Sequence, residues 1–69
     1  MLNNKQFTLK QLRGLSGLSQ EELGKAVQLT ARTIGTYEND IDSFKKVSYT
    51  KLQEIAKVLN VSVDDIFLG

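Results

Sequence analysis

The amino-acid sequence predicts an all-α fold, in which five short helices form a compact domain around one hydrophobic core. Five times along the chain an apolar residue precedes Ser or Thr, and a second apolar residue follows four positions after the hydroxyl residue. These sets are Phe7-Thr8 with Leu12, Leu18-Ser19 with Leu23, Leu29-Thr30 with Ile34, Val47-Ser48 with Leu52, and Val61-Ser62 with Ile66. Behind these starts apolar residues recur at helical spacing, and no run alternates with the period of two that a strand requires.

Each of these sets is typical of a helix start. The hydroxyl accepts a hydrogen bond from a free backbone amide, and the apolar residues around it clamp the first turn. Gln11 and Glu22 complete capping boxes, and Asp65 does so approximately. Gly17 and Asn60 belong to residue types that tolerate the left-handed conformation at a helix end. The expected helices cover residues 9–16, 20–26, 31–38, 49–59 and 63–67.

The segment from Asn39 to Val47 lacks helical periodicity, so we expect one long loop between the first three helices and the last two. No internal repeat or flexible linker divides the chain, which we interpret as a single domain over residues 1–69. Its expected core consists of Leu12, Leu23, Val27, Ile34, Tyr37, Leu52, Ile55, Ala56, Leu59 and Ile66.

Composition excludes several kinds of functional site. The 69 residues include no Cys and no His, which removes disulfides, zinc sites of the finger type and the commonest enzymatic bases and nucleophiles. We therefore expect neither enzymatic activity nor a cofactor. A net charge of +1 is only weak support for binding nucleic acid. No apolar run suits a membrane span or a signal peptide, which leads us to expect a cytoplasmic location.

The helices expected over 20–26 and 31–38 are separated by four residues, the connection length of a helix-turn-helix unit. On the second of them, Ile34 and Tyr37 face the core. The residues left outside are Ala31, Arg32, Thr33, Gly35 and Thr36. One guanidinium, two hydroxyls and small side chains suit close approach to the base edges of DNA, although an ordinary solvated helix face would have a similar composition.

Several segments of the sequence carry a resemblance to a known family. They are Leu18-Ser19-Gln20-Glu21-Glu22-Leu23, Thr33-Ile34, Tyr37-Glu38-Asn39, Ile55-Ala56 and Val61-Ser62-Val63-Asp64-Asp65-Ile66-Phe67. In order and nearly in spacing they resemble the Cro/C1-type (XRE-like) helix-turn-helix family, which includes phage repressors and Cro proteins. The match runs from about Leu9 to Phe67. It implies a lambda-repressor-like domain that binds duplex DNA sequence-specifically as a transcriptional regulator, foremost as a repressor.

The resemblance also implies which side chains contact the bases. In the family these lie at exposed early and middle positions of the recognition helix, which here are Ala31, Arg32, Thr33 and Thr36. Arg32 is the first choice, because Arg can bond guanine with two hydrogen bonds. The alternative for Arg32 is a phosphate contact without sequence preference. Either threonine hydroxyl could instead bond its own helix backbone.

Phosphate contacts are implied for Gln20, which opens the second helix, and for Asn39, which closes the third. The structural alternatives are a Gln20 that bonds only water and an Asn39 that only caps its helix. Lys45 and Lys46 are further candidates for phosphate. They lie in a loop that is longer than the common family form and begins at Asp40, where the family often has Gly. Nearby acidic side chains would weaken their field, so a merely solvated loop is the alternative.

Arg13 and Glu38 match a family ion pair that pins the recognition helix to the scaffold, so losing either one would strand a charge. The chain departs from the family at Gln28, where the turn usually has Gly, and at Gly24, where the second helix usually has Ala. Together with Gly35 inside the recognition helix, these departures predict low stability.

Family members commonly bind DNA as two-fold dimers whose recognition helices lie about 34 Å apart. A homodimer of this chain could use its apolar end, unless Ile66 and Phe67 close the core of the monomer. This end comprises Val63, Ile66, Phe67 and Leu68. Two alternatives involve a protein partner. The chain could be an antitoxin that binds a toxin protein and its own promoter, or the N-terminal module of a longer sensor that carries a regulatory domain.

Overall fold

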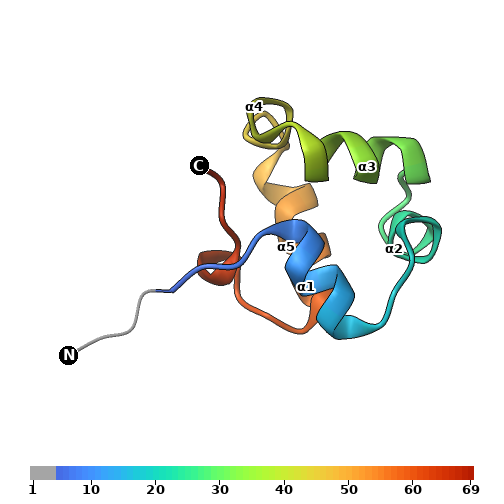
Figure 1. Cartoon of the computed structure of the whole chain (residues 1–69), viewed down its shortest axis with the longest axis horizontal. Helices are drawn as coiled ribbons and strands as arrows, with labels where there is room; N and C mark the ends of the chain where they lie inside the picture. Colours follow the sequence, from blue (N-terminus) through green and yellow to red (C-terminus); the bar gives the residue numbers. More distant parts are fainter. Residues whose placement is uncertain (1–4) are drawn as a thin grey trace.

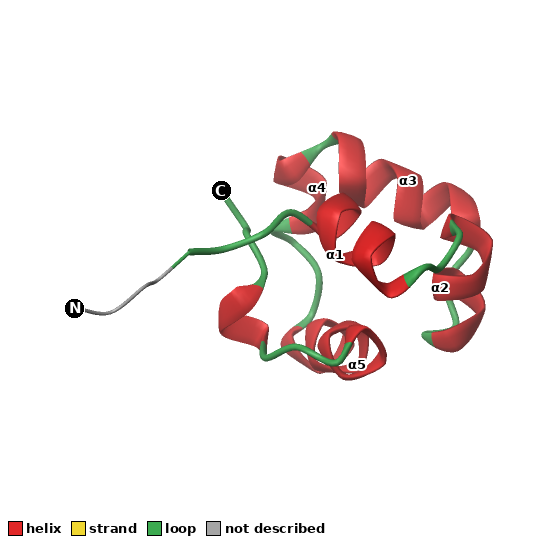
Figure 2. Ribbon diagram, turned by 60° about the horizontal axis from the view of Figure 1, so that its bottom comes forward, coloured by secondary structure: helices red, strands yellow, loops and turns green. Residues whose placement is uncertain are grey.

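The computed structural model describes residues 5–69, and the regular secondary structure of these residues is helical apart from one isolated β-bridge. Its elements are α1 (Leu9–Ser16), α2 (Gln20–Ala26), α3 (Ala31–Asn39), α4 (Ile41–Phe44), α5 (Tyr49–Leu59) and the 3-10 turn η1 (Val63–Asp65). Helix α1 contacts both α3 and α5, and in Figure 2 it lies between them; α3 runs along one side of the molecule in Figure 1. Helix α3 packs chiefly against α2 and α4. The all-helical prediction is confirmed.

Hydroxyl side chains start four of the helices, as the sequence predicts. Thr8, Ser19, Thr30 and Ser48 each accept a hydrogen bond of 3.0–3.1 Å from the backbone N–H three residues later. Such a cap satisfies a donor that the first helical turn leaves without a partner. The bounds predicted for α1, α2 and α5 are confirmed, and α3 extends one residue further than predicted, to Asn39.

The helix ends also follow the sequence pattern. Gly17 closes α1 with a φ of 74°, and Asn60 closes α5 with a φ of 60°, both in the left-handed region. Glycine has no Cβ to clash there, and asparagine is among the few other residues that tolerate this conformation. These two ends direct the chain into the turns before α2 and η1.

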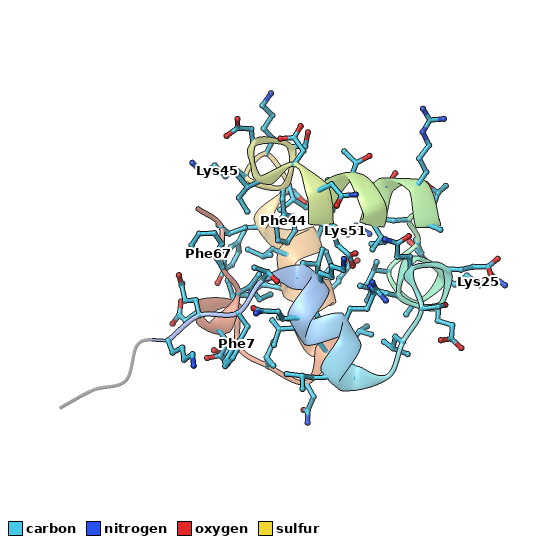
Figure 3. The ribbon with its side chains drawn as sticks, in the orientation of Figure 1. Phe7, Lys25, Phe44, Lys45, Lys51 and Phe67 are labelled. Carbon is cyan, nitrogen blue, oxygen red and sulfur yellow. The ribbon has the colours of Figure 1, made fainter. Side chains whose placement is uncertain are left out.

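The prediction of a long loop over residues 39–47 is wrong, because residues 41–44 form α4. Asp40 caps this helix. Its Oδ1 accepts from the backbone N–H of Asp42 at 3.1 Å, and its Oδ2 accepts from the hydroxyl of Ser43 at 2.9 Å. Phe44 is fully buried, with its ring centroid 5.2 Å from that of Tyr37 on α3. Figure 3 shows Phe44 directed from α4 into the body of the molecule.

The prediction of a helix over residues 63–67 is also wrong, since only the short turn η1 forms there. The chain leaves the helical path in order to pair with the N-terminal segment. Phe7 N–H donates to the Asp65 carbonyl at 2.9 Å, and Phe67 N–H donates to the Phe7 carbonyl at 2.8 Å. Ile66, between these bonds, is 1% exposed and closes the core. Long-range pairing has thus replaced the last turn of helix.

The core contains the buried side chains of Leu9, Leu12, Leu23, Val27, Ile34, Phe44, Leu52, Ile55, Ala56, Leu59 and Ile66. Nine of the ten predicted core residues are among them, and the tenth, Tyr37, packs against the core while partly exposed. Sequence analysis missed Leu9 and Phe44. Within the described residues, no helix is long and apolar enough to cross a membrane.

The turn between α2 and α3 explains why glycine stands at position 24, and it holds Gln28 in the left-handed region. Gln28 adopts a φ of 62°, the left-handed conformation for which the family usually has Gly. The Leu29 N–H donates to the Gly24 carbonyl at 2.7 Å, which draws the turn close against α2. A Cβ at Gly24 would lie 2.5 Å from the Leu29 carbonyl oxygen. The expectation that Gly24 is only a weak helix former is therefore corrected, because alanine does not fit at this position.

We expect Gly24→Ala to destabilise the protein by about 1–3 kcal/mol, although alanine is the better helix former, because its methyl group collides with backbone. The matched control is Gly14→Ala in α1, where a Cβ meets nothing within 4 Å. That change should stabilise the fold by about 0.5–1 kcal/mol. Urea unfolding followed by circular dichroism measures both, and a stabilising Gly24→Ala would contradict the tight turn.

Candidate nucleic-acid interface

Helix α3 presents one face to the core and the other to solvent along one side of the molecule (Figure 1). Ile34 is fully buried and anchors the helix, while Arg32 and Thr36 are exposed. Residues four apart lie on the same helix face, so the structure brings Arg32 and Thr36 together. Among the described residues, the Arg32 guanidinium has no hydrogen bond or ion pair. Its donors are free for a ligand.

Thr33 and Ala31 are only partly exposed and lie toward the start of α3. The hydroxyl of Thr33 lies 3.0 Å from that of Thr30, which also accepts from the Thr33 backbone N–H at 3.1 Å. The Thr33 hydroxyl thus has a partner in the helix cap, a side chain rather than the helix backbone. Of the four predicted base-contacting residues, Arg32 and Thr36 are the two that the structure leaves exposed.

The side chain of Gln20 reaches from α2 to α3, so that its amide group lies beside α3. Its Nε2 donates to Oε1 of Glu38 at 3.0 Å. The side chain runs over Gly35, where a Cβ would stand 3.5 Å from the same Nε2. One hydrogen of the amide is used by Glu38, which leaves the second for another acceptor. Gln20 is partly buried and has a specific protein partner, so water is not its only contact.

The other predicted phosphate contacts lie at the C-terminal end of α3 and after α4. Asn39 is its last residue and is exposed, while the neighbouring Asp40 provides the cap residue in an extended conformation. Lys45 and Lys46 are exposed directly after α4. The Lys45 side chain runs beside Gly69 at the end of the chain, and Figure 3 shows it on the outer side of α4. Arg32 lies at the other end of α3 from these lysines.

An ion pair between Arg13 and Glu38 connects α1 to α3, as the family resemblance implies. Both Nε and a terminal nitrogen of Arg13 donate to the Glu38 carboxylate, the latter at 3.1 Å. The other terminal nitrogen donates to the Leu18 carbonyl at 2.8 Å. The Glu38 side chain is 1% exposed and also accepts from Gln20. Three helices are therefore joined through one buried carboxylate.

This network changes the acidity of both groups. Burial alone would raise the pKa of Glu38, but the hydrogen bonds from Arg13 and Gln20, together with the positive charges of Arg13 and Lys10, outweigh it and hold that pKa below its ordinary value. The hydrogen bond to Glu38 raises the pKa of Arg13. Both side chains are therefore charged near neutral pH, and the α3 surface is held in place by a fully ionised pair.

Lys51 has a positioning role that sequence analysis missed. Its ammonium donates to the Val27 carbonyl at 2.6 Å and to the Glu54 carboxylate at 2.8 Å, which ties α5 to the end of α2 (Figure 3). Lys51 and Val27 are 24 residues apart, and no local pattern links them.

The residues that the structure describes contain no group of His, Cys, Asp and Glu that could hold a metal ion.

A family model described as helix-turn-helix matches residues 9–66, which is nearly the whole chain. The match includes α1 to α5 and both helices of the unit formed by α2 and α3. Searches of curated proteins and of solved structures found no match.

We expect Glu38 to make the free energy of unfolding depend on pH in the acidic range. Because its pKa in the folded protein is below the ordinary value of 4.5, the stability that ionised Glu38 contributes is present above that value. It is lost as the pH falls through the lowered pKa. Glu38→Gln should lower the free energy of unfolding at neutral pH. Between neutral pH and about pH 3, the free energy of unfolding of this variant should decrease less than that of the wild type.

Urea titrations at several pH values measure this dependence. Glu21→Gln, which removes an exposed carboxylate from α2, is the control and should retain the wild-type acid dependence. Parallel stability curves for wild type and Glu38→Gln would show that the carboxylate network does not contribute to the acid dependence.

Proposed function

Since this chain belongs to the Cro/C1-type helix-turn-helix family, whose members are DNA-binding transcription regulators, we propose that it is a repressor that binds a specific duplex operator through α3. The observation that supports this most directly is the exposed face of α3. Arg32 and Thr36 stand free on a helix whose opposite face is fixed by Ile34 in the core and by Glu38 in an ion pair.

Docking α3 in the major groove would place its exposed side chains against base edges, where the four bases differ in donors and acceptors. Arg32 is then the principal base contact, with Thr36, Thr33 and Ala31 as secondary ones. Gln20 suits a phosphate contact, because its amide lies beside α3 with a hydrogen to donate. Phosphate contacts of this kind set the orientation of a protein on the duplex.

Asn39, Lys45 and Lys46 would contact the backbone near the C-terminal end of α3. All three are exposed, and the two lysines follow α4 directly. The Asp40 carboxylate, which accepts two hydrogen bonds in the cap of α4, keeps its negative charge and partly offsets the field of the lysines. Phosphate contacts by lysine would make binding depend strongly on salt.

Binding as a two-fold homodimer would place two copies of α3 on successive turns of the major groove, about 34 Å apart. Of the four apolar residues predicted for this contact, Ile66 is buried in the monomer, Val63 and Leu68 are partly buried against the core, and Phe67 is 39% exposed. Phe67 is therefore the candidate for a dimer contact. A repressor of this kind would occupy its operator and block polymerase. It would act in the cytoplasm, where the DNA is located.

Arg32→Ala should reduce the preference for the operator over unrelated DNA by about 1–3 kcal/mol. Fluorescence anisotropy with labelled duplexes from the promoter of this protein's own gene, across a salt series, measures the preference. Arg32→Lys keeps the charge but loses the planar fork of donors, so it should retain salt-dependent binding and lose much of the preference.

The matched control is Lys57→Ala, which removes an exposed positive charge from α5 and should leave operator preference unchanged. Circular dichroism verifies that each variant is folded. A folded wild-type protein that binds none of these duplexes at low salt would contradict the proposed function.

A further inference from the structure

The exposed face of α3 offers very few hydrogen-bonding groups for reading bases. Ala31 has none on its side chain, and the Thr33 hydroxyl already has a partner in Thr30. Gly35 contributes no side chain. Arg32 and Thr36 are left as the two exposed side chains with polar groups in the first six residues of the helix. The base preference of α3 therefore depends on what these two side chains can recognise.

The Arg32 side chain matches guanine. Its planar fork of N–H groups is exposed and, among the described residues, has no protein partner, so both donors can reach one base. Guanine presents two acceptors, O6 and N7, side by side in the major groove. Adenine is usually recognised by Asn or Gln and cytosine by Asp or Glu, and residues 31–36 contain none of these.

The Thr36 side chain matches the methyl group of thymine. It is exposed and ends in a methyl group and a hydroxyl, and threonine methyls contact the thymine C5-methyl in the major groove. Thr36 is one helical turn after Arg32, with Cβ atoms about 5–6 Å apart. Bases along one strand are about 3.4 Å apart, so the thymine would lie one or two base pairs from the guanine.

Small residues around Thr36 allow its short side chain to reach the bases. Ala31 presents little bulk at the surface of α3, and Gly35 lets the Gln20 side chain lie close against the helix, so the helix backbone can approach the floor of the groove. The flexible Gln20 side chain lies across Gly35 and is held there by Glu38, which leaves the Thr36 side free. A bulky residue at position 31 would hold Thr36 away from the bases.

We infer that each operator half-site presents one guanine to Arg32 and, one or two base pairs away, one thymine methyl to Thr36. This inference rests on the proposed function and names the bases that the proposed site recognises.

The test begins with selection of duplexes from a randomised pool by the wild-type chain. In the selected duplex, each guanine is replaced in turn by 7-deazaguanine, which lacks the N7 acceptor and still pairs with cytosine. One guanine in each half-site should lower the wild-type affinity by about fivefold or more when it is replaced. The same replacement should have no effect on the binding of Arg32→Ala.

Each thymine is then replaced by deoxyuridine, which lacks only the methyl group. One replacement near the sensitive guanine should lower the wild-type affinity by about two- to fourfold. Thr36→Val keeps the methyl group and replaces the hydroxyl, so it should retain this effect, whereas Thr36→Ser keeps the hydroxyl but loses the methyl group and should lose it. The two variants separate a methyl contact from a hydrogen bond and serve as controls for folding.

The outcomes separate the inference from the function on which it rests. If the chain selects no sequence, the proposed function fails, and the inference fails with it. If it selects a sequence but no 7-deazaguanine effect depends on Arg32, or the methyl effect is the same in Thr36→Ser and Thr36→Val, the proposed function stands and the inference is overturned.

Discussion

One buried carboxylate determines how the candidate DNA-binding face is held. Glu38, at the inner side of α3, accepts hydrogen bonds from Arg13 of α1 and Gln20 of α2. Breaking a buried ion pair by removing one partner typically costs about 3–5 kcal/mol, because the remaining charge is stranded. Burial of Ile34 directs one face of α3 to the core, and the directional hydrogen bonds to Glu38 hold the helix in that rotation. That rotation is what turns Arg32 and Thr36 to the outside.

The surface of α3 is made of residues that are poor choices for a helix on its own. Gly35 and three threonines in or next to the helix lower its intrinsic propensity, and Gln28 holds a left-handed conformation just before it. Packing, caps and the Glu38 network offset these costs. Small side chains suit contact with a DNA groove, so the weak helix propensity of these residues is consistent with a binding surface.

Most of the fold could be predicted from local chemistry. The caps at Thr8, Ser19, Thr30 and Ser48 bond backbone within one turn, so the sequence alone places the starts of α1, α2, α3 and α5. Other features depend on distant segments.

Pairing of Phe7 with residues 65–67 shortens the last helix, and Lys51 reaches a carbonyl 24 residues away. Helix α4 was predictable in principle, because Asp is also a good helix cap and Ile41 and Phe44 have helical spacing. For the candidate site, sequence identified Arg32 and Thr36, but the partner of the Thr33 hydroxyl required the structure.

The central claim is that this chain binds DNA with the face of α3 that carries Arg32. The most direct test is to add an operator duplex to the ¹⁵N-labelled protein and map the backbone amide shifts by NMR. Our account predicts that the largest changes occur in residues 31–39 and at Gln20, with little change in the C-terminal half of α5. Changes concentrated in α5 or η1, with α3 unaffected, would contradict it.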